Sequence, residues 1–402
     1  MNLVEQHIIE KSNSSFKELD DLCFKSKNIY NSTLYLWRQK LINDKNFISS
    51  KESYKLIKEL NSYTEIPQNV AVATFNLVYQ NIRAYFASLK SFKRNPNSFS
   101  GLPRMPKYKN SENGRCIAIF NKRVIPKKNA RKDGIIRFTG LNFSVKSKIP
   151  VDAINQVRFI PKDGLIVVEI VYTVNTISKE FNGLCAAIDL GLNNLATITS
   201  NNAKPIIING KPLKSVNQFF NKKKTKIQST LQKRNKKKWS KKLARLQRKR
   251  NNKVKDYLHK AGKKVIDYCL VNNITLLAIG KNNSWKQSIN LGSKNNQNFV
   301  QIPHSKLIQI IKYKCELKGV KVEITEESYT SKCSFIDNEE IKNHKEYKGK
   351  RQNRGLFISN NGTKINADCN GSFNILRKVI PSTHYNELRD RGLVVSPVVI
   401  LP

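Results

Sequence analysis

The stretch from Cys185 to Ile198, CAAIDLGLNNLATI, constrains this chain more than any other feature. Small and apolar residues precede Asp189, which is typical of a strand covered on both faces. Gly191 allows a sharp turn of the backbone, and a second apolar strand follows. A carboxylate after a buried strand is costly unless a cation neutralises it, and a divalent metal is a natural candidate. An aspartate that merely caps a hairpin turn fits the stretch equally well, so both interpretations stay open at this point.

The charge of the chain points to a large polyanionic partner. Its 402 residues carry 73 Lys and Arg against 29 Asp and Glu, a net charge of +44, while 39% hydrophobic residues indicate a folded protein of two or three domains. Nucleic acid is the default partner for such a charge. We see no long apolar segment and no lipidation signal, so we expect no membrane role and a cytoplasmic location, nucleoid-associated if the host is prokaryotic. Seven scattered cysteines show no disulfide framework and favour a reducing compartment.

The first half of the chain changes from helical to strand periodicity. Residues 1–14 hold one strand, Leu3 to Ile9, and residues 15–97 show apolar stripes of helical spacing that predict a small bundle. Residues 98–178 begin with a basic, proline-broken linker at 98–110, after which come short strands with turn signals at Asp133-Gly134 and Asp163-Gly164. Antiparallel strands at this spacing predict a small barrel that includes the first strand.

The most basic tract follows the hairpin at Asp189. Residues 221–260 hold 18 Lys and Arg and a single acid, Asp256, and their apolar residues recur at helical spacing. We therefore predict a structured helical hairpin over 214–272 whose cationic face contacts a phosphate backbone. The candidate nucleic-acid-binding residues are Lys222, Lys223, Lys224, Arg234, Lys236, Lys237, Lys238, Lys241, Lys242, Arg245, Arg248 and Arg250.

The remaining elements alternate between strands and helices. Ile274–Gly280 reads as a buried strand, 302–319 as a helix and 320–324 as another strand, followed by an irregular polar insertion to Thr363. Asp368 then begins the last helix, and the tail from Pro381 is unassigned. Acids after two strands and at this helix can converge where strand ends meet.

Two further motifs give the chain a family resemblance. They are YTSKCS at Tyr329–Ser334 and NADCNGSFNI at Asn366–Ile375, and they follow the strand with Asp189 in a fixed order. The chain resembles TnpB, the transposon-associated RNA-guided nucleases with a RuvC core, related to type V CRISPR effectors and Fanzor proteins. The resemblance implies an α/β RNase H-like (RuvC) nuclease domain at 179–402 with a degenerate zinc-ribbon-like insertion at 329–364. It also implies an N-terminal wedge β-barrel, residues 1–14 and 98–178, interrupted by a helical recognition lobe at 15–97.

The catalytic residues follow from the resemblance with one departure. The family usually has a Glu where this chain has Gly280, but some members carry a relocated Glu just before the Tyr-Thr-Ser motif. Glu327 matches that position, and Glu326 is the alternative. The resemblance thus implies Asp189, Glu327 and Asp368 as catalytic ligands of two Mg²⁺ ions.

The zinc ribbon of the family is incomplete in this chain. Ile336 stands where a second Cys would follow Cys333, and Cys333 with His344 supplies too few ligands for a closed zinc site. We expect no zinc, and we interpret Cys333 and Cys369 as small buried residues.

The resemblance implies cleavage of double-stranded target DNA directed by a guide (omega-type) RNA, with base pairing reading the sequence. The loss of the acid at Gly280 and of zinc ligands also fits a nuclease-inactive, RNA-guided DNA-binding repressor. A transposase with a Tyr nucleophile is disfavoured, because it would need paired histidines and the five His are scattered.

Overall fold

The computed structural model describes residues 1–43, 48–122, 134–235, 239–282, 301–353, 355–380 and 397–402. The chain divides into two compact units, Met1–Asn175 and Thr176–Pro402, and each is described by itself. Within the described ranges, no helix combines the length and the apolar composition that a membrane span requires.

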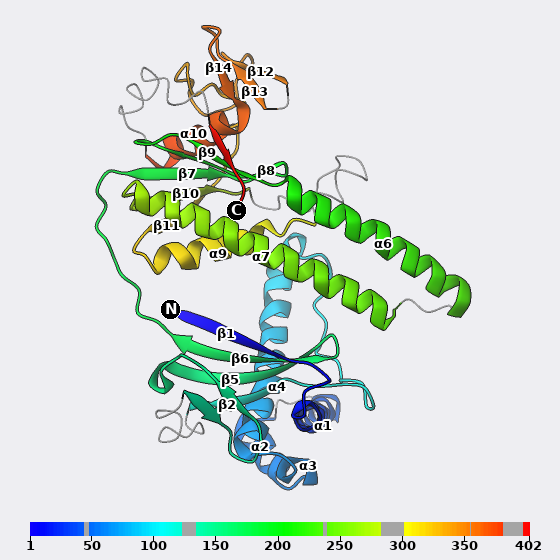
Figure 1. The fold of residues 1–402 in the computed structure, drawn as a ribbon. Helices are drawn as coiled ribbons and strands as arrows, with labels where there is room; N and C mark the ends of the chain where they lie inside the picture. Colours follow the sequence, from blue (N-terminus) through cyan, green and yellow to red (C-terminus); the bar gives the residue numbers. More distant parts are fainter. Residues whose placement is uncertain (44–47, 123–133, 236–238, 283–300, 354, 381–396) are drawn as a thin grey trace. The chain divides into compact units, whose positions relative to one another are not determined.

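The first unit contains a four-stranded antiparallel sheet in the order β1-β6-β5-β2 (Figure 1). Strand β1 pairs with β6 along its whole length, so the prediction that the first residues join the later strands is confirmed. At the turn between β5 and β6, Asp163 and Gly164 both have positive φ, 52° and 77°, which is the hairpin geometry that an Asp-Gly pair favours. Asp133 lies outside the described residues. Strands β3 and β4 form a separate pair, and closure of a barrel stays a prediction.

Helices α1 and α4 form the helical part of this unit, as the apolar stripes predicted. Their buried residues, among them Leu34 and Val78, pack against each other, while Leu19 and Val70 join the core with the sheet. Two short helices, α2 and α3, were not predicted. The elements of the unit are β1 (Asn2–Ile9), α1 (Phe16–Asn43), α2 (Ser50–Lys58), α3 (Asn61–Thr64), α4 (Gln68–Arg94), β2 (Ala118–Asn121), β3 (Ile135–Arg137), β4 (Ser144–Lys146), β5 (Ile154–Lys162) and β6 (Leu165–Thr173).

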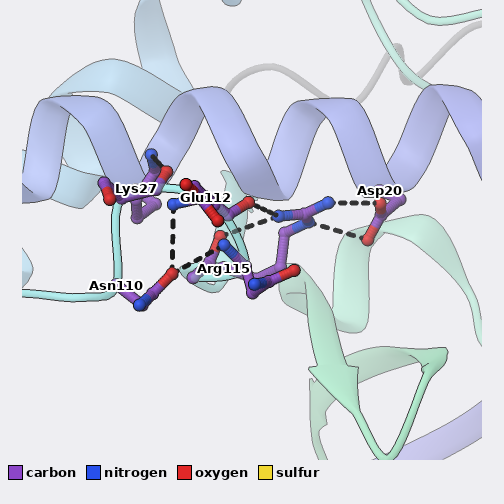
Figure 2. Close-up of polar contacts among 8 residues, drawn as sticks. Asp20, Lys27, Asn110, Glu112 and Arg115 are labelled. Carbon is purple, nitrogen blue, oxygen red and sulfur yellow. Dashed lines mark hydrogen bonds and ion pairs between the residues drawn. The ribbon is translucent and has the colours of Figure 1, made fainter.

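Polar contacts fasten the end of the basic linker to helix α1 (Figure 2). Arg115 donates two parallel hydrogen bonds to the carboxylate of Asp20, from Nε at 2.9 Å and from Nη2 at 2.8 Å. Two turns further along α1, Lys27 is 3% exposed and donates to the Ser111 carbonyl at 2.6 Å. Burial lowers the pKa of Lys27. Because a bidentate Arg–carboxylate pair fixes geometry as well as adding energy, this contact holds the chain in place where β2 begins.

The second unit contains a mixed six-stranded sheet in the order β11-β10-β7-β8-β9-β15. Strands β7, β8 and β9 pair antiparallel in sequence order, and β10 and β11 then run parallel to β7 on its other side. An antiparallel meander is thus followed by two parallel strands beside its first strand. The buried strand predicted before Asp189 is therefore confirmed as β7, at the centre of the sheet.

Helices cover both faces of this sheet (Figure 1). Successive residues of β7 point to opposite faces, so Ala186 and Ile188 join the core with α7 and α9, while Cys185 and Ala187 join the core with α10. The small side chains of Cys185 and Ala187 let α10 approach β7 closely. This explains why the strand is apolar on both faces.

Three features of the second unit differ from the sequence predictions. The insertion is not irregular throughout, because it contains an antiparallel sheet in the order β12-β13-β14. Strand β9 and, in the unassigned tail, β15 were not predicted. The elements of the unit are β7 (Cys185–Asp189), β8 (Asn194–Ser200), β9 (Ile206–Asn209), α6 (Lys211–Asn235), α7 (Lys241–Val271), β10 (Leu276–Gly280), α9 (His304–Glu316), β11 (Lys321–Thr325), β12 (Lys350–Asn353), β13 (Leu356–Ile358), β14 (Lys364–Asn366), α10 (Ala367–Val379) and β15 (Val398–Ile400).

Candidate active site

The carboxyl ends of three parallel strands meet at one edge of the second sheet. Asp189 is the last residue of β7, Gly280 the last residue of β10 and Thr325 the last residue of β11. The pairing aligns Ile188 with Ile279 and Gly280 with Thr325. Glu327 follows β11 by two residues, so the sheet brings it to the same edge as Asp189. In α/β sheets this edge is where ligands bind.

Helix α10 brings the third acid to this edge. Asp368 is its second residue, and the side chain of Asn366 caps the helix by accepting from the backbone N–H groups of Asp368 at 3.0 Å and Cys369 at 3.2 Å. A carboxylate in the first turn interacts favourably with the positive end of the helix dipole. The side chain of Asn194, at the start of β8, donates to Asp368 Oδ2 at 2.6 Å. The acid is therefore held from both the helix and the sheet.

Two glycines leave the space that two of the carboxylates occupy. A Cβ atom added to Gly280 would lie 3.0 Å from Glu327 Oε2 and 2.5 Å from Ile375 Cδ1. A Cβ atom added to Gly371, on α10, would lie 2.9 Å from Asp189 Oδ2. The two carboxylates thus lie close to the backbone of these glycines, and the absence of a side chain at position 280 makes room for the Glu327 carboxylate.

Buried side chains of α10 tie the segments of the site together. Ser372 donates to the carbonyls of Ala187 on β7, at 3.0 Å, and Thr197 on β8, at 3.1 Å. Asn374 donates to the carbonyls of Thr330 at 2.9 Å and Cys333 at 2.7 Å, just after Glu327. Because buried polar groups cost free energy unless they are bonded, these contacts fix the register of the helix against strand and loop. The sequence motif contained these residues, but their positioning role was not predicted.

The three acids line a single pocket of about 290 Å³. Burial, and then the negative charges of Asp368 and Glu327, raise the pKa of Asp189 to about 8, while Arg351 acts in the opposite direction. Burial also raises the pKa of Glu327, partly offset by a backbone hydrogen bond from Asn282 and by the charge of Lys378. Repulsion between carboxylates in a partly dry pocket is what a bound cation would relieve. The pocket therefore has the charge and the hard oxygen donors that suit a divalent cation.

The three acids lie too far apart in this structure to form a complete metal site. Among the residues that the structure describes, no three or more His, Cys, Asp and Glu side chains are grouped closely enough to hold a metal ion. Arg351, from β12 in the insertion, reaches the pocket and its Nη2 lies 3.4 Å from Asp368 Oδ1. The Asp368 carboxylate is thus shared between a guanidinium and the Asn194 amide. The assignment of the three acids as metal ligands stays a prediction.

Comparisons with known proteins match two parts of this chain to family models. A family model described as OrfB_IS605, "Probable transposase", matches residues 169–286, and a "Cas12f1-like, TNB domain" model matches residues 304–375. A TnpB-like protein of Acidianus two-tailed virus is 27% identical over 211 residues, which are 51% of this chain and 44% of that relative. The chain is similar to this TnpB-like protein and to the two family models. Its curated relative is matched over less than half of that relative's length.

One solved structure resembles this chain in fold, and a second aligns with it at a lower score. The mini-RNA-guided endonuclease CRISPR-Cas_phi3 aligns with a TM-score of 0.51 and 12% identity, over 94% of this chain and 92% of that one. A Cas12f1 solved with sgRNA and target DNA aligns with a TM-score of 0.36 and 17% identity, over 93% and 98% of the two chains. The first likeness supports a shared fold for this chain.

The two candidate glutamates of this chain differ in position. Glu327 is partly buried and lines the pocket with the two aspartates. Glu326 is exposed, and its Oε1 accepts a hydrogen bond from the Ser328 hydroxyl at 2.8 Å. Adjacent residues in extended backbone point in opposite directions, which accounts for the difference. The geometry favours Glu327 over the alternative.

Cys333 in the insertion and Cys369 on α10 are buried, as predicted. Cys333 and Cys369 are both 0% exposed, and the Cys333 thiol donates to the Lys342 carbonyl at 3.6 Å. Burial raises the pKa of Cys333, which disfavours the thiolate that zinc requires. His344 is exposed, and its Nε2 is paired with the Glu340 carbonyl at 2.7 Å.

Those predicted nucleic-acid-binding residues that the structure describes lie on α6 and α7, side by side in Figure 1. Lys222, Lys223, Lys241, Lys242 and Arg245 are exposed, and Lys224 and Arg248 are partly so. Lys236, Lys237 and Lys238 lie outside the described residues, and so does the side chain of Arg234.

Arg250 differs from the other candidates. Its Nε donates to Asn217 Oδ1 at 2.8 Å and its Nη2 to the Gln301 carbonyl at 2.8 Å, with the guanidinium over the Phe220 ring. Burial lowers the pKa of Arg250. This arginine joins α6 to α7 and to the chain before α9, a structural role that charge alone did not reveal.

Three polar residues of the pocket were missed in the sequence. Asn194, Asn282 and Arg351 all line it. Asn194 and Asn282 could have been found, since each lies within five residues of an expected strand end, Asp189 or Gly280. Arg351 could not have been found in this way, because it lies within the insertion and is not close in sequence to either strand end.

Proposed function

We propose that this chain is an RNA-guided DNA endonuclease of the TnpB type, which hydrolyses phosphodiesters in its RuvC-like domain. The observation that carries the proposal is that Asp189, Glu327 and Asp368, from three distant segments, line one pocket at the carboxyl ends of the parallel strands of the second sheet. Cas_phi3, which shares the fold, is described as a mini-RNA-guided endonuclease. Family resemblance and pocket chemistry therefore support the same reaction.

The same three acids would hold two Mg²⁺ ions. When bound, such ions activate a water molecule and stabilise the leaving oxygen of the phosphodiester. Asp189 would give up its proton when a cation binds, because the cation would offset the burial and the negative charges that raise its pKa to about 8. Asn194 orients Asp368, and the Asn282 backbone orients Glu327. Arg351 would leave Asp368 for the phosphate of the substrate, which carries the opposite charge.

The basic helices α6 and α7 would hold the nucleic acid. A guide RNA would select a double-stranded DNA target by base pairing, while the protein contacts the backbone of the heteroduplex. The first unit would supply the wedge, from residues 1–14 and 98–178, and the helical recognition lobe, from residues 15–97. The net charge of +44 supports a partner with many phosphates.

One experiment tests the proposal at three levels. The protein is expressed with its flanking DNA, the RNA that copurifies is sequenced, and cleavage of matched target DNA is measured with Mg²⁺. We expect a specific RNA from the same locus and guided cleavage. Glu327→Gln should abolish cleavage yet retain RNA and target binding, because Gln keeps the shape but removes the charge that holds a hard cation. Glu326→Gln is the matched control and should cleave like the wild type.

A second function is favoured by one observation. Arg351 already pairs with Asp368, and the acids are not grouped as a metal site within the described residues. An RNA-guided DNA-binding repressor without nuclease activity would keep such a pair. Guided binding without cleavage at any Mg²⁺ concentration would favour the repressor, whereas random host RNA in the purified protein would contradict both functions.

A further inference from the structure

The two basic helices of the second unit form an arm that receives little support from the core. Between residues 221 and 233 of α6 no residue is buried, and between residues 239 and 253 only Leu243 is, at 6% exposed. Helix α6 is 25 residues long and α7 is 31, so each is about 40 Å or longer. Figure 1 shows the far ends of both helices beyond the edge of the sheet. The arm, residues 222–235 and 239–249, holds 11 Lys and Arg residues and no Asp or Glu.

A tryptophan lies where the arm turns from α6 to α7. Trp239 directly precedes Ser240, whose hydroxyl caps α7 by accepting from the Leu243 N–H at 3.2 Å. A large apolar residue at this position commonly packs on the fourth residue of the helix, as a hydrophobic staple. That residue is Ala244, which is too small to cover an indole, and Trp239 is 62% exposed. A packing role therefore does not account for the ring.

The surroundings of Trp239 favour a nucleobase as the missing partner. Lys241, Lys242 and Arg245 follow it on the first turn and a half of α7, and all three are exposed. At the base of the arm a second exposed aromatic, Phe219, has Lys223 Nζ 5.8 Å from its ring centroid. Exposed aromatic rings among cations are the pattern of proteins that bind single strands, where bases stack on rings while cations follow the phosphates.

We propose that Trp239 stacks on an unpaired base of a nucleic-acid strand that lies along the arm. This inference rests on the proposed function in needing a nucleic-acid partner, but it adds a contact to the base at a defined point. The cations supply affinity that depends on salt and is indifferent to the bases. The indole supplies a contact that depends on the base and is nearly independent of salt.

The test compares strands that differ only in their bases. Full-length protein freed of nucleic acid is titrated with single-stranded RNA and DNA 12-mers and with an abasic 12-mer of equal phosphate number. Trp239→Ala should weaken binding of the strands with bases about 10-fold and leave the abasic strand unaffected. The slope of log affinity against log salt should not change, because no phosphate contact is lost. Phe181→Ala, an equally exposed aromatic at 58% outside the arm, is the control and should change neither.

Fluorescence supplies a second measurement. Strands with bases should quench tryptophan emission of the wild type, and the quenching should disappear in Trp239→Phe and with the abasic strand. An equal loss of affinity for all strands, or no loss for any, would overturn the stacking contact while the proposed function stood. A wild-type protein that binds none of the strands would overturn both. Stronger effects with RNA than with DNA would assign the stacked base to the guide, and the reverse to the target.

Discussion

Replacing Asp189 by Asn should stabilise the protein without metal in a way that grows with pH. In the folded state the pKa of Asp189 is about 8, against an ordinary value of 3.8, so the folded chain keeps a proton that the unfolded chain releases. Stability is therefore lost as pH rises from about 4 to about 8, at about 1.4 kcal/mol per pH unit, and is constant above. Between pH 5 and pH 9 the loss covers about three pH units, or about 4 kcal/mol. Asn carries no charge at any pH and avoids this loss.

Unfolding by urea is measured in a chelating buffer. It is monitored through hydrogen exchange in peptides from β7 and β8, because these peptides report on the second unit alone. The free energy of unfolding of Asp189→Asn minus that of the wild type should increase by about 4 kcal/mol between pH 5 and pH 9. At pH 9, Mg²⁺ should reduce the difference in the free energy of unfolding between Asp189→Asn and the wild type, because the cation binds only the ionised wild-type site.

The control is Asp256→Asn, the same chemical change at a side chain 62% exposed on α7. Its difference from the wild type should stay within about 0.5 kcal/mol at both pH values. A difference for Asp189→Asn that does not change with pH would refute the reasoning, since Asp189 would then be ionised in the folded state throughout the range.

Two further predictions concern Gly280 beside the pocket and Cys333 in the insertion. In Gly280→Ala the new methyl would lie 2.5 Å from Ile375 Cδ1 and 3.0 Å from Glu327 Oε2, so we expect a loss of about 1–3 kcal/mol in urea unfolding and slower cleavage. Gly101→Ala, where a Cβ meets no atom within 4 Å, should change neither, and an unaffected Gly280→Ala would argue against the packing described. Elemental analysis should find no zinc, because Cys333 is buried with few possible co-ligands. One tightly bound zinc per chain would contradict this.

The central sheet could be predicted because its strands carry strong local signals. Strand β7 is apolar on both faces, and only a strand between two helical layers needs such a sequence. The positions of Asp189 and Asp368 at the pocket could be predicted for the same reason, since Asp189 ends a clear strand and Asp368 lies at the start of a clear helix. The choice of Glu327 over Glu326 depended on its distance to the Tyr-Thr-Ser motif in the family resemblance, which periodicity could not supply.

The rest of the site could not be predicted because its contacts are remote in sequence. Strand β12 is exposed at all four residues, so it shows no alternation that would reveal a strand or aim Arg351 at Asp368. Asn370 and Asn374 are 0% exposed, yet asparagine is usually a surface residue. Only the packed structure shows that their amides satisfy backbone carbonyls of another segment.

These buried amides also have a consequence for how the chain can vary over evolutionary time. Asn370 accepts from the Phe335 N–H and donates to the Cys333 carbonyl, and Asn374 bonds Thr330 and Cys333, so the insertion is fastened where it leaves the sheet. Its other end runs directly into α10 through β14. Both ends are thus anchored to one helix, independently of what lies between them. The segment between these two ends can therefore become longer or shorter, or lose a zinc knuckle, while the spatial arrangement of the acids in the pocket stays the same.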